Sequence, residues 1–123
     1  MADLDVSLKE CMNITGAIGA CLVDYTSGMM LGATGGGREL DLEVAAAGNT
    51  EVVRAKMRTM ADLGLKDGIE DILITLGGQY HLIRPLTSSR GEGLFLYLAL
   101  LRHSANLAMA RRQLQAIEHE LVV

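Results

Sequence analysis

The sequence predicts an α+β fold whose elements follow the order helix, two strands, helix, three strands, helix. Two observations carry this prediction. In three segments the apolar residues recur every three to four positions, which is the period of an α-helix. Between these segments lie short apolar runs bounded by turn residues, a pattern typical of strands. The length of 123 residues suits one domain, residues 1–123, with a single hydrophobic core.

The first predicted elements are a helix over residues 3–13 and a hairpin. Asp3 is placed to cap the helix N-terminus, and one apolar face is formed by Leu4, Leu8, Cys11 and Met12. Residues 17–24 and 29–34 are predicted strands. The turn-rich residues 25–28 between them are typical of a hairpin connection.

A second, longer helix is predicted from Asp41 to about Leu63. The stripe that suits a sheet comprises Leu42, Ala46, Val53, Met57 and Met60. Beside this stripe runs a flank of small or β-branched residues: Val44, Gly48, Val52, Ala55 and Thr59. The combined apolar arc covers more than half of the helix, which is wider than one sheet contact requires. The remaining polar face carries Glu43, Glu51, Arg54 and Arg58.

Three further strands and a helix complete the predicted order. Residues 71–76 and 80–86 form a strand pair, and Pro85 marks the end of the second strand or an irregular step in it. Residues 94–101 are apolar at every position, as expected of a central strand covered on both faces. Ser104 is the predicted cap of the last helix, whose core-facing stripe comprises Leu107, Ala110, Leu114, Ile117 and Leu121.

Composition excludes several classes of function. The net charge of −4, without a run of basic residues, argues against nucleic acid as a partner. No apolar stretch is long enough to cross a membrane, and the acidic, amphipathic N-terminus does not resemble a signal peptide. Cys11 and Cys21 are therefore expected to be reduced thiols in the core, and the protein is expected in the cytoplasm, with any recruitment to a membrane left to its partners.

No constellation of residues indicates catalysis, a metal or a cofactor. His81, His103 and His119 lack the spacing of metal ligands, and no serine or cysteine lies in a nucleophile motif. The run Gly32–Arg38, with glycine at positions 35–37, is compatible with an anion-binding nest. A flexible corner between a strand and a helix explains it equally well, since the residues of a P-loop are absent.

Two features favour self-association. Glycine at position 48 destabilises the helix by about 1 kcal/mol relative to alanine. One physical reason for a glycine there is that it lets a second helix approach closely. The strand from Ile72 to Leu76 has no proline, lysine or bulge to protect its edge. The alternative is that another part of the same chain covers the helix flank. The predicted self-association surface comprises Val44, Ala45, Gly48, Asn49, Val52, Ala55, Thr59, Ile72 and Ile74.

Two stretches of the chain carry a family pattern. Residues 14–33 combine a Gly-rich approach, an apolar strand, an Asp-containing turn and a second short strand. Residues 94–115 combine an apolar strand with the triplet Ala105-Asn106-Leu107, which opens a helix and is followed by Ala110-Arg111. These stretches resemble the first hairpin and the last strand and helix of Roadblock/dynein-light-chain domains. The element order is similar to that family over the whole chain.

The resemblance implies a five-stranded antiparallel sheet, with the long helix on one face and the two terminal helices on the other. It implies a homodimer formed through the third strand, residues 71–76, and the second helix, residues 41–60. The bacterial branch of the family implies a small Ras-like GTPase and associated signalling proteins as partners. The chain ends just after the last predicted helix, so regulation through a longer C-terminal extension is not expected.

We therefore expect a non-catalytic homodimeric adaptor without a cofactor, which binds a small GTPase and modulates its nucleotide cycle or localisation. The predicted partner-binding residues are charges on the polar face of the second helix: Glu51, Arg54 and Arg58. Charges on such a face are most often only solvated. The alternative function is a small-molecule sensor that holds an anion or nucleotide at residues 35–37.

Overall fold

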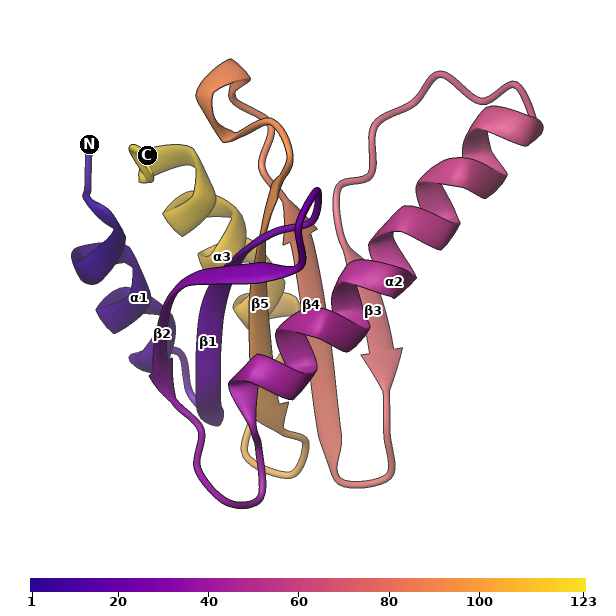
Figure 1. Ribbon diagram of the computed structural model, residues 1–123. Helices are drawn as coiled ribbons and strands as arrows, with labels where there is room; N and C mark the ends of the chain where they lie inside the picture. The colour runs from indigo at the N-terminus through magenta and orange to yellow at the C-terminus, as the bar shows by residue number, and fades with distance from the viewer.

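The computed structural model describes residues 1–123 and confirms the predicted order of elements (Figure 1). The helices and strands are α1 (Leu4–Met12), β1 (Ala17–Asp24), β2 (Met29–Gly35), α2 (Leu42–Asp62), β3 (Ile72–Thr75), β4 (Gln79–Pro85), β5 (Leu94–Leu101) and α3 (Leu107–Glu120). A short 3-10 helix, η1 (Ser89–Gly91), lies between β4 and β5 and was not predicted. None of the helices is both long and apolar enough to cross a membrane.

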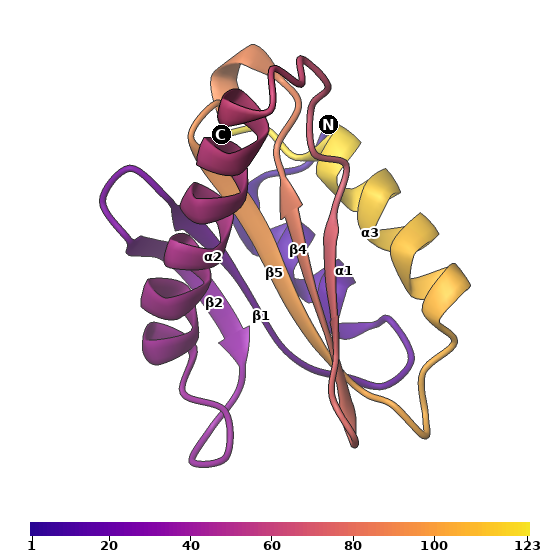
Figure 2. The same ribbon diagram turned by 90° about the vertical axis from the view of Figure 1, so that its right-hand side faces the viewer.

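The five strands form one antiparallel sheet in the order β2-β1-β5-β4-β3. Helix α2 lies on one face of this sheet, while α1 and α3 lie on the other (Figure 2). The central strand, β5, is buried on both faces from Phe95 to Leu100, as predicted from its unbroken apolar sequence. Pro85 is the last residue of β4, where its missing N–H breaks no ladder bond inside the strand.

The sheet divides the hydrophobic core in two, where a single core was expected, because helices cover both of its faces. The larger part packs α1 and α3 on the sheet through residues such as Leu8, Leu82, Leu98 and Leu114. The smaller part packs α2 on the opposite face through residues such as Leu42, Val53, Phe95 and Tyr97.

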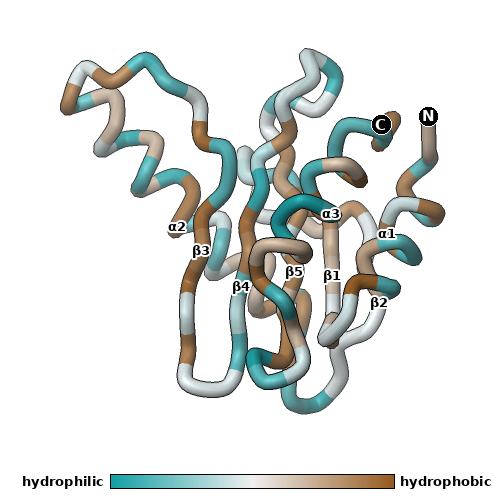
Figure 3. Tube along the Cα trace, turned by 180° about the vertical axis from the view of Figure 1, so that it is seen from behind, coloured by the Kyte–Doolittle hydropathy of each residue, from teal (hydrophilic) through white to brown (hydrophobic).

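The two edge strands differ in their suitability for pairing. Leu22 pairs with Gly32 and Val23 with Met30, so Leu31 is left as a bulge in β2. The other edge, β3, pairs with β4 in an unbroken register, and its apolar residues extend to the border of the sheet (Figure 3). A bulge protects an edge against pairing with another chain. The predicted edge strand is therefore confirmed, and it is the less protected of the two.

Side chains cap all three helices. Asp3 and Asp41 cap α1 and α2, as predicted for Asp3. The predicted cap of α3, Ser104, is wrong: Asn106 holds that position, and its Oδ1 accepts a hydrogen bond from the Met109 N–H at 3.1 Å. The backbone N–H of Ser104 donates to the Leu101 carbonyl in a turn that ends β5, so the helix starts only beyond this turn. Asparagine is as good an N-cap as serine.

The two cysteines are free, buried and separated by the sheet, as expected of reduced core thiols. Burial raises the thiol pKa of both Cys11 and Cys21 to about 12, with the charge of Glu10 adding to the shift at Cys11. Only about one thiol in ten thousand would then be ionised at pH 8. We expect the native protein to resist iodoacetamide at pH 8 and to react at both positions in denaturant. Mass spectrometry of the alkylated protein would reveal any rapid native labelling, which would contradict this burial.

Candidate interaction surface

Helix α2 extends beyond the sheet that it covers. Its buried residues, Leu42, Ala46, Thr50 and Val53, all lie in the first twelve residues of the helix. From there the helix runs diagonally across the sheet, and its last turns lie beyond the β3 edge (Figure 1). Met57 and Met60 of the predicted stripe are only half-buried, and of the two only Met57 packs against the core on this face of the sheet. The C-terminal half of α2 is thus left with an incomplete packing surface.

The predicted small-residue flank of α2 is open. Val44 is 67% exposed, and Ala55 and Thr59 are also exposed. A Cβ atom added to Gly48 would meet no atom within 4 Å. Only Val52 is half-buried. No other part of the chain covers this flank, so the alternative explanation of the wide apolar arc fails.

A hollow of about 280 Å³ lies between this flank and the sheet. We call it the α2–β4 hollow. It is lined by Glu39, Leu40, Asp41, Val44, Ala45, Gly48, Asn49, His81 and Tyr97. The structure thus brings four of the predicted self-association residues together around one depression. Sequence reasoning missed His81 and Tyr97, which reach the hollow from β4 and β5, because the order of strands in the sheet places them there.

The aromatic residues of the hollow are ordered by contacts with each other. The rings of His81 and Tyr97 meet edge to face with their centroids 5.5 Å apart. The His81 Nε2 atom lies 2.7 Å from the Gln79 Oε1 atom. Burial lowers the pKa of His81 and raises the pKa of the Tyr97 phenol to about 12. Both side chains are therefore neutral near pH 7, and the charge of the hollow comes from Glu39 and Asp41.

The predicted strand residues Ile72 and Ile74 border the same region. Both are half-buried and pack against the core on the α2 face of the sheet. Ile74 pairs with His81 across the two strands, which places it next to the α2–β4 hollow. The α2 flank, the hollow and the β3 edge are therefore neighbours on one side of the molecule. We call this combined region the α2–β3 surface.

The predicted partner-binding residues lie on the outer side of α2. Glu51, Arg54 and Arg58 are all exposed, and none of them forms an ion pair within the chain. Their charges are free to meet another molecule. This position separates them from the α2 stripe that packs on the sheet.

The glycine corner at positions 35–37 has no free anion-binding nest. The φ angles of Gly35, Gly36 and Gly37 are all positive. The N–H groups of Gly36 and Gly37 donate to the carbonyls of Ile18 and Leu40 at 2.8 and 3.1 Å. A Cβ atom on Gly35 would lie 2.7 Å from the Ile18 carbonyl oxygen. These glycines permit a close backbone turn, and the N–H groups of Gly36 and Gly37, which a nest would offer to a phosphate, are occupied.

The N-terminus of α2 is likewise occupied. The Asp41 Oδ1 atom accepts hydrogen bonds from the N–H groups of Glu43 at 3.0 Å and Val44 at 3.2 Å. A carboxylate already neutralises the positive end of the helix dipole. In the hollow of about 480 Å³ beside this corner, the N–H groups of Gly36 and Gly37 are therefore not free for an anion, and the remaining side-chain donors are those of Arg38 and Gln79.

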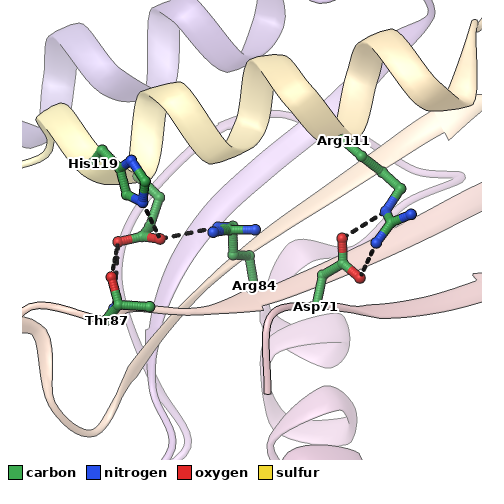
Figure 4. Close-up of polar contacts among 6 residues, drawn as sticks. Asp71, Arg84, Thr87, Arg111 and His119 are labelled. Atoms are coloured by element: carbon green, nitrogen blue, oxygen red, sulfur yellow. Dashed lines mark hydrogen bonds and ion pairs between the residues drawn. The ribbon is translucent and has the colours of Figure 1, made fainter. Parts of the chain in front are cut away.

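Two ion pairs, neither predicted from the sequence, fix α3 to the sheet and its connecting loops (Figure 4). The buried Arg84 Nε donates to the Glu118 Oε1 atom at 2.9 Å, and Thr87 donates its hydroxyl to Oε2 at 3.0 Å. Nearer the N-terminus of α3, Arg111 makes two hydrogen bonds to the Asp71 carboxylate, at 2.7 and 3.0 Å. These carboxylates are engaged in structural contacts. No three His, Cys, Asp or Glu side chains are grouped so as to hold a metal ion.

Comparison with known proteins gives matches at the level of structure. Neither a protein-family model nor a curated protein sequence matches the chain. A Roadblock/LC7 domain from Streptomyces avermitilis superposes with a TM-score of 0.79 at 13% identity, covering 96% of this chain and 93% of its own. MglB from Myxococcus xanthus gives a TM-score of 0.80 at 14% identity, covering 94% and 81%. An MglB described in a tetrameric arrangement superposes with a TM-score of 0.68 at 18% identity, covering 94% of this chain and 88% of its own. The chain therefore has the Roadblock/LC7 fold, with structural likeness to MglB.

Proposed function

We propose that this protein is a non-catalytic homodimeric adaptor that binds a small Ras-like GTPase and modulates its nucleotide cycle or localisation. The observation that carries the proposal is the continuity of the α2–β3 surface. An open helix flank, a hollow and an unprotected strand edge adjoin one another, and the chain itself covers none of them. The GTPase partner rests on the family that the fold and the sequence pattern resemble.

Twofold symmetry explains why these features occur on the same side. An axis perpendicular to the sheet, passing between two β3 strands, pairs them antiparallel and keeps both α2 helices on one face. Each overhanging α2 would then lie across the neighbouring sheet, which supplies the packing surface that its own sheet lacks. The bulge at Leu31 makes the β2 edge a poorer choice for the same contact. The tetrameric arrangement described for an MglB supports self-association in proteins of this fold.

The outer charges of α2 supply the partner surface. Pairing of the α2 helices through their small-residue flanks would leave Glu51, Arg54 and Arg58 of both copies on the outside of the helix pair. A doubled set of arginines offers charge-assisted hydrogen bonds to carboxylates on a partner. In this arrangement the protein contributes binding and positioning, and the nucleotide chemistry belongs to the GTPase.

Titration against small GTPases encoded in the same operon tests the proposal. We expect binding to at least one GTPase loaded with GDP or a GTP analogue, measured by calorimetry. The double variant Arg54→Glu/Arg58→Glu should weaken this binding about tenfold or more, because it places like charges at the contact. The matched control Lys9→Glu/Arg112→Glu makes the same change in net charge on α1 and α3, across the sheet, and should bind normally. Absence of binding in both nucleotide states would remove the proposal.

A further inference from the structure

Charge is segregated along α2 and the segment that leads into it. From Glu39 to Glu51 the chain carries four acidic residues and no basic one. Between positions 54 and 60 it carries three basic residues and no acidic one: Arg54, Lys56 and Arg58. Two such helices attract each other when they lie antiparallel and repel when they lie parallel. The twofold arrangement proposed above is antiparallel, so the acidic half of each helix would lie beside the basic half of the other.

Lys56 is the basic residue placed on the inner side of this contact. With Ala45, Asn49 and Val52 it forms a row at spacings of four, three and four residues, which is one side of a helix. Ala45 and Asn49 line the α2–β4 hollow, so the row faces the β3 and β4 side of the sheet. Lys56 is exposed and forms no ion pair within the chain.

The α2–β4 hollow has the complementary chemistry. Glu39 and Asp41 line it, and neither forms an ion pair within the chain. Asp41 uses only Oδ1 to cap the helix, which leaves Oδ2 without a protein partner. His81 and Tyr97 are neutral near pH 7 and do not oppose a cation, since burial lowers the pKa of the imidazole and raises that of the phenol. The apolar surfaces of Leu40 and Val44 suit the methylene chain of a lysine.

We infer that the hollow is a socket for the basic half of α2 from a second copy of this chain, in which Lys56 of the partner subunit pairs with Glu39 and Asp41. The inference rests on the proposed homodimer and specifies its register. Symmetry forms the contact twice, once at each end of the helix pair. The socket thereby fixes how far the two helices slide past each other, a property that apolar packing of small residues specifies poorly.

A charge exchange tests the socket. Lys56→Glu should raise the dimer dissociation constant about tenfold or more, because three carboxylates would then meet at each end of the helix pair. Glu39→Lys should weaken the dimer in the same direction. The double variant Lys56→Glu/Glu39→Lys restores an opposite-charge pair and should recover an affinity within about threefold of the original. Glu39 is exchanged in preference to Asp41, which also caps α2.

Sedimentation velocity over a dilution series supplies the dissociation constants. Lys9→Glu, an equal change of charge on the opposite face, should leave the dimer unaltered. A double variant as weak as the two single changes combined would overturn the socket while the dimer itself stands. A dimer indifferent to Lys56→Glu would do the same. An unmodified protein that stays monomeric at every concentration would instead remove the homodimer on which the socket depends.

Discussion

Glu118→Ala is expected to lower the free energy of unfolding by about 3–5 kcal/mol, as measured by urea denaturation at fixed protein concentration. The Glu118 side chain is 1% exposed and that of Arg84 is 6% exposed, so removing the carboxylate leaves a guanidinium buried without its counter-ion. Thr87 loses the acceptor for its hydroxyl in the same step. The loss of stability should exceed that of an apolar core truncation of similar size, because the variant leaves an unpaired buried charge in addition to a cavity.

Two further variants test whether the loss of stability comes from the unpaired buried charge or from lost packing. Replacing both partners, as in Arg84→Met/Glu118→Met, should recover most of the lost stability, since no ion then remains in the core. Asp71→Ala breaks the second ion pair, but Arg111 is 48% exposed and remains solvated. That change should cost less than about 1 kcal/mol. Equal losses for Asp71→Ala and Glu118→Ala would show that burial does not determine the strength of these pairs.

The elements that the sequence predicted well are those in which a local pattern and a long-range contact agree. β5 is apolar at every position and lies at the centre of the sheet, and the stripe of α2 from Leu42 to Val53 faces the core. The glycine corner was open to two interpretations because its residue types suit both. The hydrogen bonds of Gly36 and Gly37 to backbone carbonyls resolve it, and residue identity does not reveal how a backbone N–H is paired.

The features that sequence reasoning missed arise from contacts between distant segments. Arg84 lies in a strand and Glu118 in a helix, and each alone resembles an ordinary surface charge. The α2–β4 hollow needs residues from α2, β4 and β5, which meet only through the strand order β1-β5-β4. The two-residue turn Gly77–Gly78 sets Ile74 opposite His81. This turn was the one local signal in the sequence that could have placed His81 beside the predicted self-association surface.

Gly48→Leu is expected to affect folding and self-association in opposite directions. Leucine favours a helix interior over glycine by about 0.8 kcal/mol, and the added Cβ meets no atom of its own chain within 4 Å. The isolated subunit should therefore become slightly more stable. In the dimer the same side chain would project into the neighbouring α2 and force the helices apart, which should raise the dissociation constant about tenfold or more.

The opposite signs make Gly48→Leu a sharper probe than a change that merely unfolds the protein. Denaturation at concentrations below the dimer dissociation constant measures the gain in stability of the isolated subunit. Sedimentation over a dilution series measures the loss of dimer affinity. Gly48→Ala gives most of the helical gain with a single methyl group and should weaken association less. The neighbouring Ala47→Leu adds bulk at an exposed position off the small-residue flank and should leave association unchanged. If Gly48→Leu and Ala47→Leu both retain the original affinity, the flank is not where the helices meet, and the antiparallel arrangement that brings Lys56 to the socket loses its basis.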